Sequence, residues 1–463
     1  MVGARELRRP LSTAIAGVLA TALLADPAVA HAGSFGTTRT APIPSWLVIG
    51  TGVGVVGASF LFTSLLTDRT LVEAVPRRAR SSQAVRWLAP IAPPARTLLR
   101  WAAVGVVVVA VAVGIVGPES PRANLLTLGV WIVWWAGYTA TTYLVGNSWP
   151  AVNPWRTVAS VIPSERRSLP DSVGVWPSVV GLLALVTAEV SSPLAADSRL
   201  LALAVGCYSA VTVGGAVVFG DAWFERVDPV ARTFRCYGLL APVRRSGTGL
   251  DLALPGTGLI RESTVYDRGE VAFVIALVWA TTFDGLVSTA AWGRVATAAA
   301  GVGVPRVVLT LLALGGGFGC FAGLYWLAAR AVRRTAPTYV TTRYLAGWFA
   351  TALIPIAAGY HLAHFAGYLL SFAPTVLSVA AAPLAPPAAL TVLSLPPWFG
   401  AVQIIAVVVG HVVAVWVAHA RAFALFAGRV QPVRSQYPFA AVAVCYTATS
   451  LWIVAQPTAA GLA

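Results

Sequence analysis

The sequence predicts an all-α fold, a polytopic membrane helix bundle of about ten transmembrane helices after an N-terminal signal peptide, or about eleven if the peptide is uncleaved. Composition is the first reason: 57% of the 463 residues are hydrophobic and 11% charged, and mean hydropathy is +0.77. Such a chain is not a water-exposed globule. The second reason is charge placement. The formal charge of +15 comes from arginines that fall mainly between apolar runs, so the expected partner is a lipid bilayer and not nucleic acid.

The N-terminus has the pattern of a secretory signal peptide. Arginines precede an apolar run at 11–25 and the small residues 28–30, which match the n-region, h-region and cleavage site. We therefore expect residues 1–30 to be a signal peptide or, if uncleaved, a first transmembrane helix, and 31–463 to be a single integral membrane domain. Cleavage would leave His31 at the mature N-terminus, where its amine and ring could chelate a metal such as copper; otherwise His31 lies in a polar loop.

Apolar runs of about the ~20 residues that a helix needs to cross hydrocarbon follow along the mature chain. They are 46–66, 101–117, 125–145, 176–190, 200–220, 271–292, 307–329, 343–370, 398–420 and 439–455.

Arginines accumulate in alternate connections between these runs, which predicts the orientation. The arginine-rich connections include 156–167, 226–268, 330–343 and 421–434. The positive-inside rule places them in the cytoplasm. Connections with few cations, at 118–124, 190–199, 293–305 and 372–397, would face outward. The expected localisation is the cell membrane, multi-pass, with the mature N-terminus and the C-terminus outside.

An internal helix-pair repeat is expected around 101–157 and 176–233. Each copy ends an apolar run with glycine, a tryptophan and an Asx-Pro step, in Gly146, Trp149, Asn153 and Pro154 and again in Gly220, Trp223, Asp228 and Pro229. Repeated halves occur in transporters, where the pathway runs between them. The alternative is duplication of a stable helix hairpin.

The longest arginine-rich connection predicts a short hairpin, and the remaining motifs are few. Residues 250–254 and 259–260 flank a Gly-rich turn at 255–258, which favours two strands against the membrane face. No GxxxxGK[ST] loop is present, so no ATP-driven motor is evident. The four cysteines show no CxxC spacing, which predicts buried free thiols.

Two apolar segments near the C-terminus, 343–370 and 398–426, hold four of the five histidines: His361, His364, His411 and His419. Imidazoles in hydrocarbon are rare and usually serve a site or pair with a neighbouring helix. On antiparallel neighbours His361, His364 and His411 would reach similar depth, whereas His419 lies near the cytoplasmic boundary and is expected at the interface.

A carboxylate, Asp284, also lies inside an apolar run. One hypothesis is a metal site lined by His361, His364 and His411, with Asp284 as a ligand, an orienting group or a base. Three nitrogens and an oxygen suit zinc or copper. The alternatives are interhelical hydrogen bonds to carbonyls or Tyr360, with Asp284 capping a helix, or haem ligation by facing histidines.

Several motifs resemble a prokaryotic polytopic membrane family commonly labelled fenitrothion hydrolase. They are His31-Ala32-Gly33, Ile43-Pro44-Ser45-Trp46-Leu47, Gly146-Asn147-Ser148-Trp149-Pro150, Asn153-Pro154-Trp155-Arg156-Thr157, Thr282-Phe283-Asp284-Gly285, Ala363-His364-Phe365, Gly410-His411 and Ala418-His419-Ala420-Arg421. The resemblance covers most of the chain and implies hydrolysis of an organophosphate triester, without assigned catalytic residues. Ala420 stands where that family is expected to have an acidic residue.

Two classes of function follow. In the first, the protein handles or transports a small solute, such as a transition metal, through the mid-membrane histidine site. In the second, it is a metal-dependent membrane hydrolase of phosphotriesters, in which a metal lowers the pKa of bound water and polarises a phosphoryl oxygen. The sequence lacks a GxSxG elbow, and we favour the first class.

Overall fold

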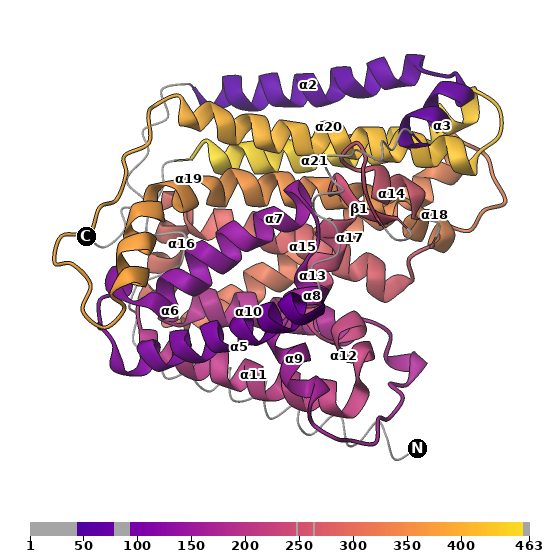
Figure 1. Cartoon of the computed structure of the whole chain (residues 1–463). Helices are drawn as coiled ribbons and strands as arrows, with labels where there is room; N and C mark the ends of the chain where they lie inside the picture. The colour runs from indigo at the N-terminus through magenta and orange to yellow at the C-terminus, as the bar shows by residue number, and fades with distance from the viewer. Residues whose placement is uncertain (1–43, 78–92, 247–248, 263, 457–463) are drawn as a thin grey trace.

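The computed structural model describes residues 44–77, 93–246, 249–262 and 264–456 and shows a helical bundle in this part of the chain (Figure 1). Eight helical segments are long and apolar enough to cross a membrane. The all-α membrane fold is therefore confirmed for the described residues. The signal peptide and His31 lie outside them.

The eight segments coincide with predicted runs. They are α2 (Ser45–Leu65), α5 (Pro93–Val116), α11 (Ser198–Phe219), α15 (Arg268–Val287), α17 (Arg306–Thr335), α18 (Thr342–Phe349) continued through the 3-10 turn η5 (Ala350–Leu353) into α19 (Ile354–Ala381), α20 (Phe399–Leu425) and α21 (Val430–Val454). The other two runs are also helical: α10 (Trp176–Ser191) is shorter, and α6 (Leu125–Leu128), η3 (Gly129–Tyr138) and α7 (Thr139–Leu144) follow one another directly.

The long helices run side by side in two groups, with α15 between them (Figure 1). In the upper group α2 lies on α20 and α21, and α20 lies on α19. In the lower group α5 and α11 pack with α9 (Pro154–Ser160). Helix α15 is buried along almost its whole length, so protein surrounds it, whereas α2 and α5 leave most of their apolar side chains for lipid.

Two connections with few cations are more helical than expected. The segment 293–305 was expected to be a loop, but most of it belongs to α16 (Ala290–Gly301), which begins after Thr289 accepts a bond from the Trp292 amide. Helix α19 was expected to end at 370 but continues through Pro374 to Ala381. A proline inside an apolar helix is tolerated where neighbouring groups satisfy the backbone it frees.

The hairpin exists, but its pairing differs from the prediction. Strands β1 (Val243–Ser246) and β2 (Gly249–Leu252) pair antiparallel, so residues 250–252, expected in the first strand, belong to the second. Gly256 has a positive φ of 83° and starts α14 (Thr257–Arg261), so residues 259–260 are helical. Glycine adopts this left-handed backbone without the steric cost other residues incur.

The arginine-rich elements α3 (Arg69–Arg77), β1, α14 and α18 lie at one end of the bundle, at the right in Figure 1. The fully buried Arg421 donates hydrogen bonds there to the carbonyls of Leu259, Glu262 and Trp348 and lies 4.0 Å from the centre of the Trp348 ring. The last carbonyls of a helix lack partners within it and attract cations. Arg421 therefore joins the ends of α14 and α18 to α20.

In both segments of the predicted repeat, the Asx residue of the Asx-Pro step caps a helix with its side chain. Asn153 accepts from the Arg156 amide at the start of α9, and Asp228 accepts from the Val230 amide at the start of α13 (Pro229–Gly238). A short helix precedes each, α8 (Trp149–Val152) and α12 (Asp221–Arg226). The copies also touch, because Arg156 forms an ion pair with Asp221.

Candidate functional site

His361 joins the two groups of helices. It is fully buried on α19; its Nδ1 lies 3.0 Å from the Tyr143 hydroxyl of α7 and its Nε2 lies 3.2 Å from the Trp135 carbonyl of η3. A carbonyl can only accept, so Nε2 carries the proton and the Tyr143 hydroxyl donates to Nδ1. This assignment makes His361 a neutral link between α19 and the η3–α7 segment.

The backbone of η3 explains why a carbonyl is turned toward His361. Residues Gly129–Tyr138 form a π-helix, in which the Thr139 amide bonds to Trp134, five residues back. Where such a segment returns to α-helical spacing, the backbone pattern skips a carbonyl, and π-helical turns are frequent at functional sites. The Trp135 carbonyl accepts its bond from another helix. Neither Tyr143 nor Trp135 was among the predicted site residues.

His364 pairs with Asp284 between α19 and α15. Nε2 of His364 lies 3.3 Å from Oδ2 of Asp284, and both side chains are largely buried. Asp284 lies about 24 Å along α15 from Arg268, at ~1.5 Å per residue, which corresponds to the half of a bilayer that is farther from Arg268. An isolated charge there costs about 2.5–3.5 kcal/mol or more. The contact gives the Asp284 carboxylate a polar partner, which carries the opposite charge when His364 is protonated.

Gly285 admits a tyrosine beside this pair. A Cβ built on Gly285 would lie 1.9 Å from the Tyr360 hydroxyl oxygen, so only glycine leaves room for that hydroxyl. The Tyr360 ring also stacks with His364 at a centroid distance of 6.5 Å. The predicted Tyr360 therefore lies at the site, next to Asp284.

His411 does not join His361 and His364, so the structure does not form the expected three-histidine site. Its Nδ1 bonds to the Val407 carbonyl of its own helix at 2.9 Å. The backbones of α19 and α20 meet at Gly359 and Gly410, since a Cβ on Gly359 would lie 2.9 Å from the Gly410 Cα. His361 lies two residues after Gly359, about 200° around α19, and therefore faces away from α20.

His419 is a structural residue. Its Nε2 lies 3.0 Å from the Leu66 carbonyl at the end of α2, and its Nδ1 lies 3.3 Å from the Gln436 side-chain oxygen on α21. It is fully buried within the protein, and its position at the membrane boundary stays a prediction. His419 thus holds α2 and α21 against α20.

The described residues form no group of three or more His, Cys, Asp or Glu side chains that could hold a metal ion. Of the predicted ligands in the described part of the chain, only His364 and Asp284 have potential ligand atoms in contact with each other. His31 lies outside the described part. Metal binding stays a prediction. The cysteines are free, as predicted, but only Cys236 is buried; Cys207, Cys320 and Cys445 are exposed on the bundle surface.

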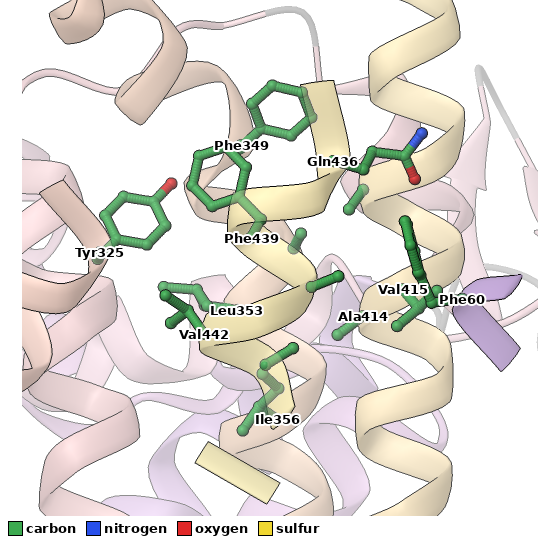
Figure 2. A pocket seen from close by; sticks show the side chains of 14 residues that line it. Phe60, Tyr325, Phe349, Leu353, Ile356, Ala414, Val415, Gln436, Phe439 and Val442 are labelled. Carbon is green, nitrogen blue, oxygen red and sulfur yellow. The ribbon is translucent and has the colours of Figure 1, made fainter. Parts of the chain in front are cut away.

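An apolar cavity lies apart from these residues, among α2, α17, η5, α20 and α21. It has a volume of about 40 Å³, and Figure 2 shows Phe349, Leu353, Ile356, Phe439 and Val442 around it. Its polar neighbours are already bonded, because Tyr325 donates to the Ala346 carbonyl and Gln436 to the Pro432 carbonyl. The cavity therefore offers room, but the polar side chains that line it already donate to backbone carbonyls.

No protein-family model, curated protein or solved structure matches this chain. The fold and the buried polar residues define its class, an integral membrane protein of apolar helices. The particular family stays an expectation from the motifs.

Proposed function

We propose that this protein transports a small solute across the membrane and that the His364–Asp284 pair binds and releases a proton during transport. The observation that carries the proposal is the 3.3 Å contact between these side chains inside an apolar bundle. Ionisable residues in such positions commonly form proton relays in pumps and transporters. A proton needs only these two partners, whereas zinc or copper takes about three or four protein ligands.

The surroundings of the pair support transport. His361, three residues before His364, bonds to Tyr143 and Trp135. These two residues lie within the first copy of the helix-pair repeat, in the segment whose first helix, α6, packs against α5 and α11 of the lower group. Transport pathways commonly run between such groups. A helix that carries both histidines can connect proton binding to movement between the groups.

A transition metal remains the alternative cargo, with His364 and Asp284 as two of its ligands. Metal analysis of the purified protein tests this version. The hydrolase function is implied by the family resemblance alone, and release of an aryl group from a phosphotriester tests it.

Infrared difference spectroscopy of the reconstituted protein tests the proton site. Acidification of the wild type should produce a protonated-carboxyl band that Asp284→Asn abolishes and His364→Gln shifts to a different pH. Asp197→Asn is the matched control, because Asp197 is an exposed helix cap and should leave the band unchanged. A wild-type band that persists in Asp284→Asn would refute the proposal.

A further inference from the structure

Three arginines share one exposed face near the end of α17. Arg330, Arg333 and Arg334 are spaced by three and four residues, which keeps each within about 60° of Arg330 around the helix. All three are exposed. Ala329 and Val332, which point to other sides of the helix, are completely buried against the bundle. The three guanidinium groups therefore point away from the protein.

The same face of α17 is apolar and exposed farther into the membrane. Leu327, one turn before Arg330, is 59% exposed, and Leu312, which points in the same direction, is 66% exposed. Arg330 lies about 36 Å along α17 from Arg306, at ~1.5 Å per residue, and the hydrocarbon core of a bilayer is ~30 Å thick. The three arginines therefore lie at the level of the lipid headgroups, on a face that meets lipid.

These arginines have no acidic partner nearby in the sequence. From residue 285 to residue 463 the chain contains no Asp or Glu, and none of the three arginines forms an ion pair with a described residue. Like charges four residues apart on a helix repel, as Arg330 and Arg334 do. The helix dipole favours cations only in the last turn, and Arg330 lies before that turn. An anion from outside the chain is the partner that would relieve this repulsion.

The segment after α17 carries further side chains typical of the headgroup region. Tyr339 is completely exposed and Tyr344 is 38% exposed, and Arg343 beside it is also exposed. Tyrosines are enriched at both membrane–water boundaries, where the ring and the hydroxyl meet apolar and polar surroundings. They agree with the level that the length of α17 gives for the arginines.

We propose that Arg330, Arg333 and Arg334 bind the headgroup of an anionic phospholipid, with its acyl chains alongside Leu327. A guanidinium group binds a phosphate through two parallel hydrogen bonds, which gives this residue type an advantage over lysine. Clusters of arginine at the end of a membrane helix attract anionic lipids. The inference does not depend on the proposed function, because it rests on a different part of the molecule.

Titration of the purified full chain in a neutral detergent tests the site, with bound lipid counted by native mass spectrometry. The wild type should bind phosphatidylglycerol more tightly than phosphatidylcholine. The triple variant Arg330→Gln, Arg333→Gln, Arg334→Gln should bind phosphatidylglycerol about 10²-fold more weakly, because each arginine near the surface contributes about fivefold. Arg333→Gln alone should lose about fivefold. The melting temperature without added lipid should not fall, since these side chains have no ion pair to lose.

The matched control is the triple variant Arg235→Gln, Arg261→Gln, Arg268→Gln. It removes the same charge from three exposed arginines at the arginine-rich end, but each of these has an acidic neighbour. Glu262 follows Arg261, Asp267 precedes Arg268, and Arg235 lines a small cavity together with Glu262. This variant should bind phosphatidylglycerol as tightly as the wild type.

Three results would overturn the proposal. The first is equal affinity of the wild type for phosphatidylglycerol and phosphatidylcholine. The second is an equal loss in both triple variants, which would show a general attraction to positive charge. The third is displacement of the lipid by an equal concentration of soluble glycerol phosphate, which would show an anion site that does not recognise lipid.

Discussion

Replacing Asp228 by asparagine should stabilise the protein, and more so as pH rises. Asp228 is 2% exposed at the start of α13. Its Oδ1 accepts from the Tyr208 hydroxyl at 2.8 Å and the Val230 amide at 2.9 Å. Burial raises its pKa from 3.8 to about 6, against the lowering effects of those bonds and of Arg156. The folded protein therefore disfavours the charged carboxylate.

The size and sign follow from this shift. A difference of about 2 pKa units corresponds to about 3 kcal/mol. Because the folded-state pKa is the higher one, the stability contribution is fully present below about pH 4 and is lost as pH rises through about 6. Asparagine keeps an oxygen for both bonds and carries no charge, as Asn153 does at the start of α9. We expect a gain of up to about 3 kcal/mol near pH 8 and little near pH 4.

Thermal unfolding in detergent, followed by tryptophan fluorescence at both pH values, measures this gain. Asp197→Asn is the control, since Asp197 also caps a helix, α11, but in an exposed position. It should show no gain that grows with pH. If Asp228→Asn were no more stable than the wild type near pH 8, or gained equally at both pH values, the burial argument would be wrong.

Two further predictions concern helix packing. Arg421→Leu should lower the free energy of unfolding by about 2–4 kcal/mol, since the buried carbonyls of Leu259, Glu262 and Trp348 lose a charged donor. Denaturant titration measures this loss, and an unchanged unfolding midpoint would refute the prediction. Gly410→Ala should cost about 1–3 kcal/mol, because its Cβ would lie 2.5 Å from the Pro355 carbonyl oxygen. Gly319→Ala, where a Cβ meets nothing within 4 Å, should be neutral or stabilising in the same melting assay.

The membrane helices were predictable because length and hydropathy alone determine whether a segment can span a bilayer. Their ends were less predictable. In a soluble protein Pro374 would predict the end of a helix, yet α19 continues through it. The strand Val243–Ser246 was missed because the glycines at 256 and 258 gave the stronger turn signal, although Gly256 starts a helix.

The sequence could single out Asp284, His361 and His364 because charged and imidazole groups are conspicuous in apolar runs. Tyr143 was missed because an aromatic residue in a membrane helix is ordinary. Trp135 was missed because it contributes a backbone carbonyl, and the side-chain pattern of a sequence does not show which carbonyls are left without a partner in their own helix. His411 was grouped wrongly because depth was considered without rotation about the helix axis. The signal was available in Gly359 and Gly410, since small residues mark where membrane helices touch.

The spacing of His361 and His364 has a mechanical consequence. Side chains three residues apart point about 60° apart on a helix, which is enough for α19 to contact η3 through one histidine and α15 through the other. Both contacts are attached to the same rigid helix, so a movement of α19 that lengthens one must alter the other. Protonation at Asp284 weakens the attraction to His364, and the resulting shift of α19 would be transmitted to the Tyr143 and Trp135 contacts of His361. A proton-driven transporter needs such a link between its proton site and its moving parts.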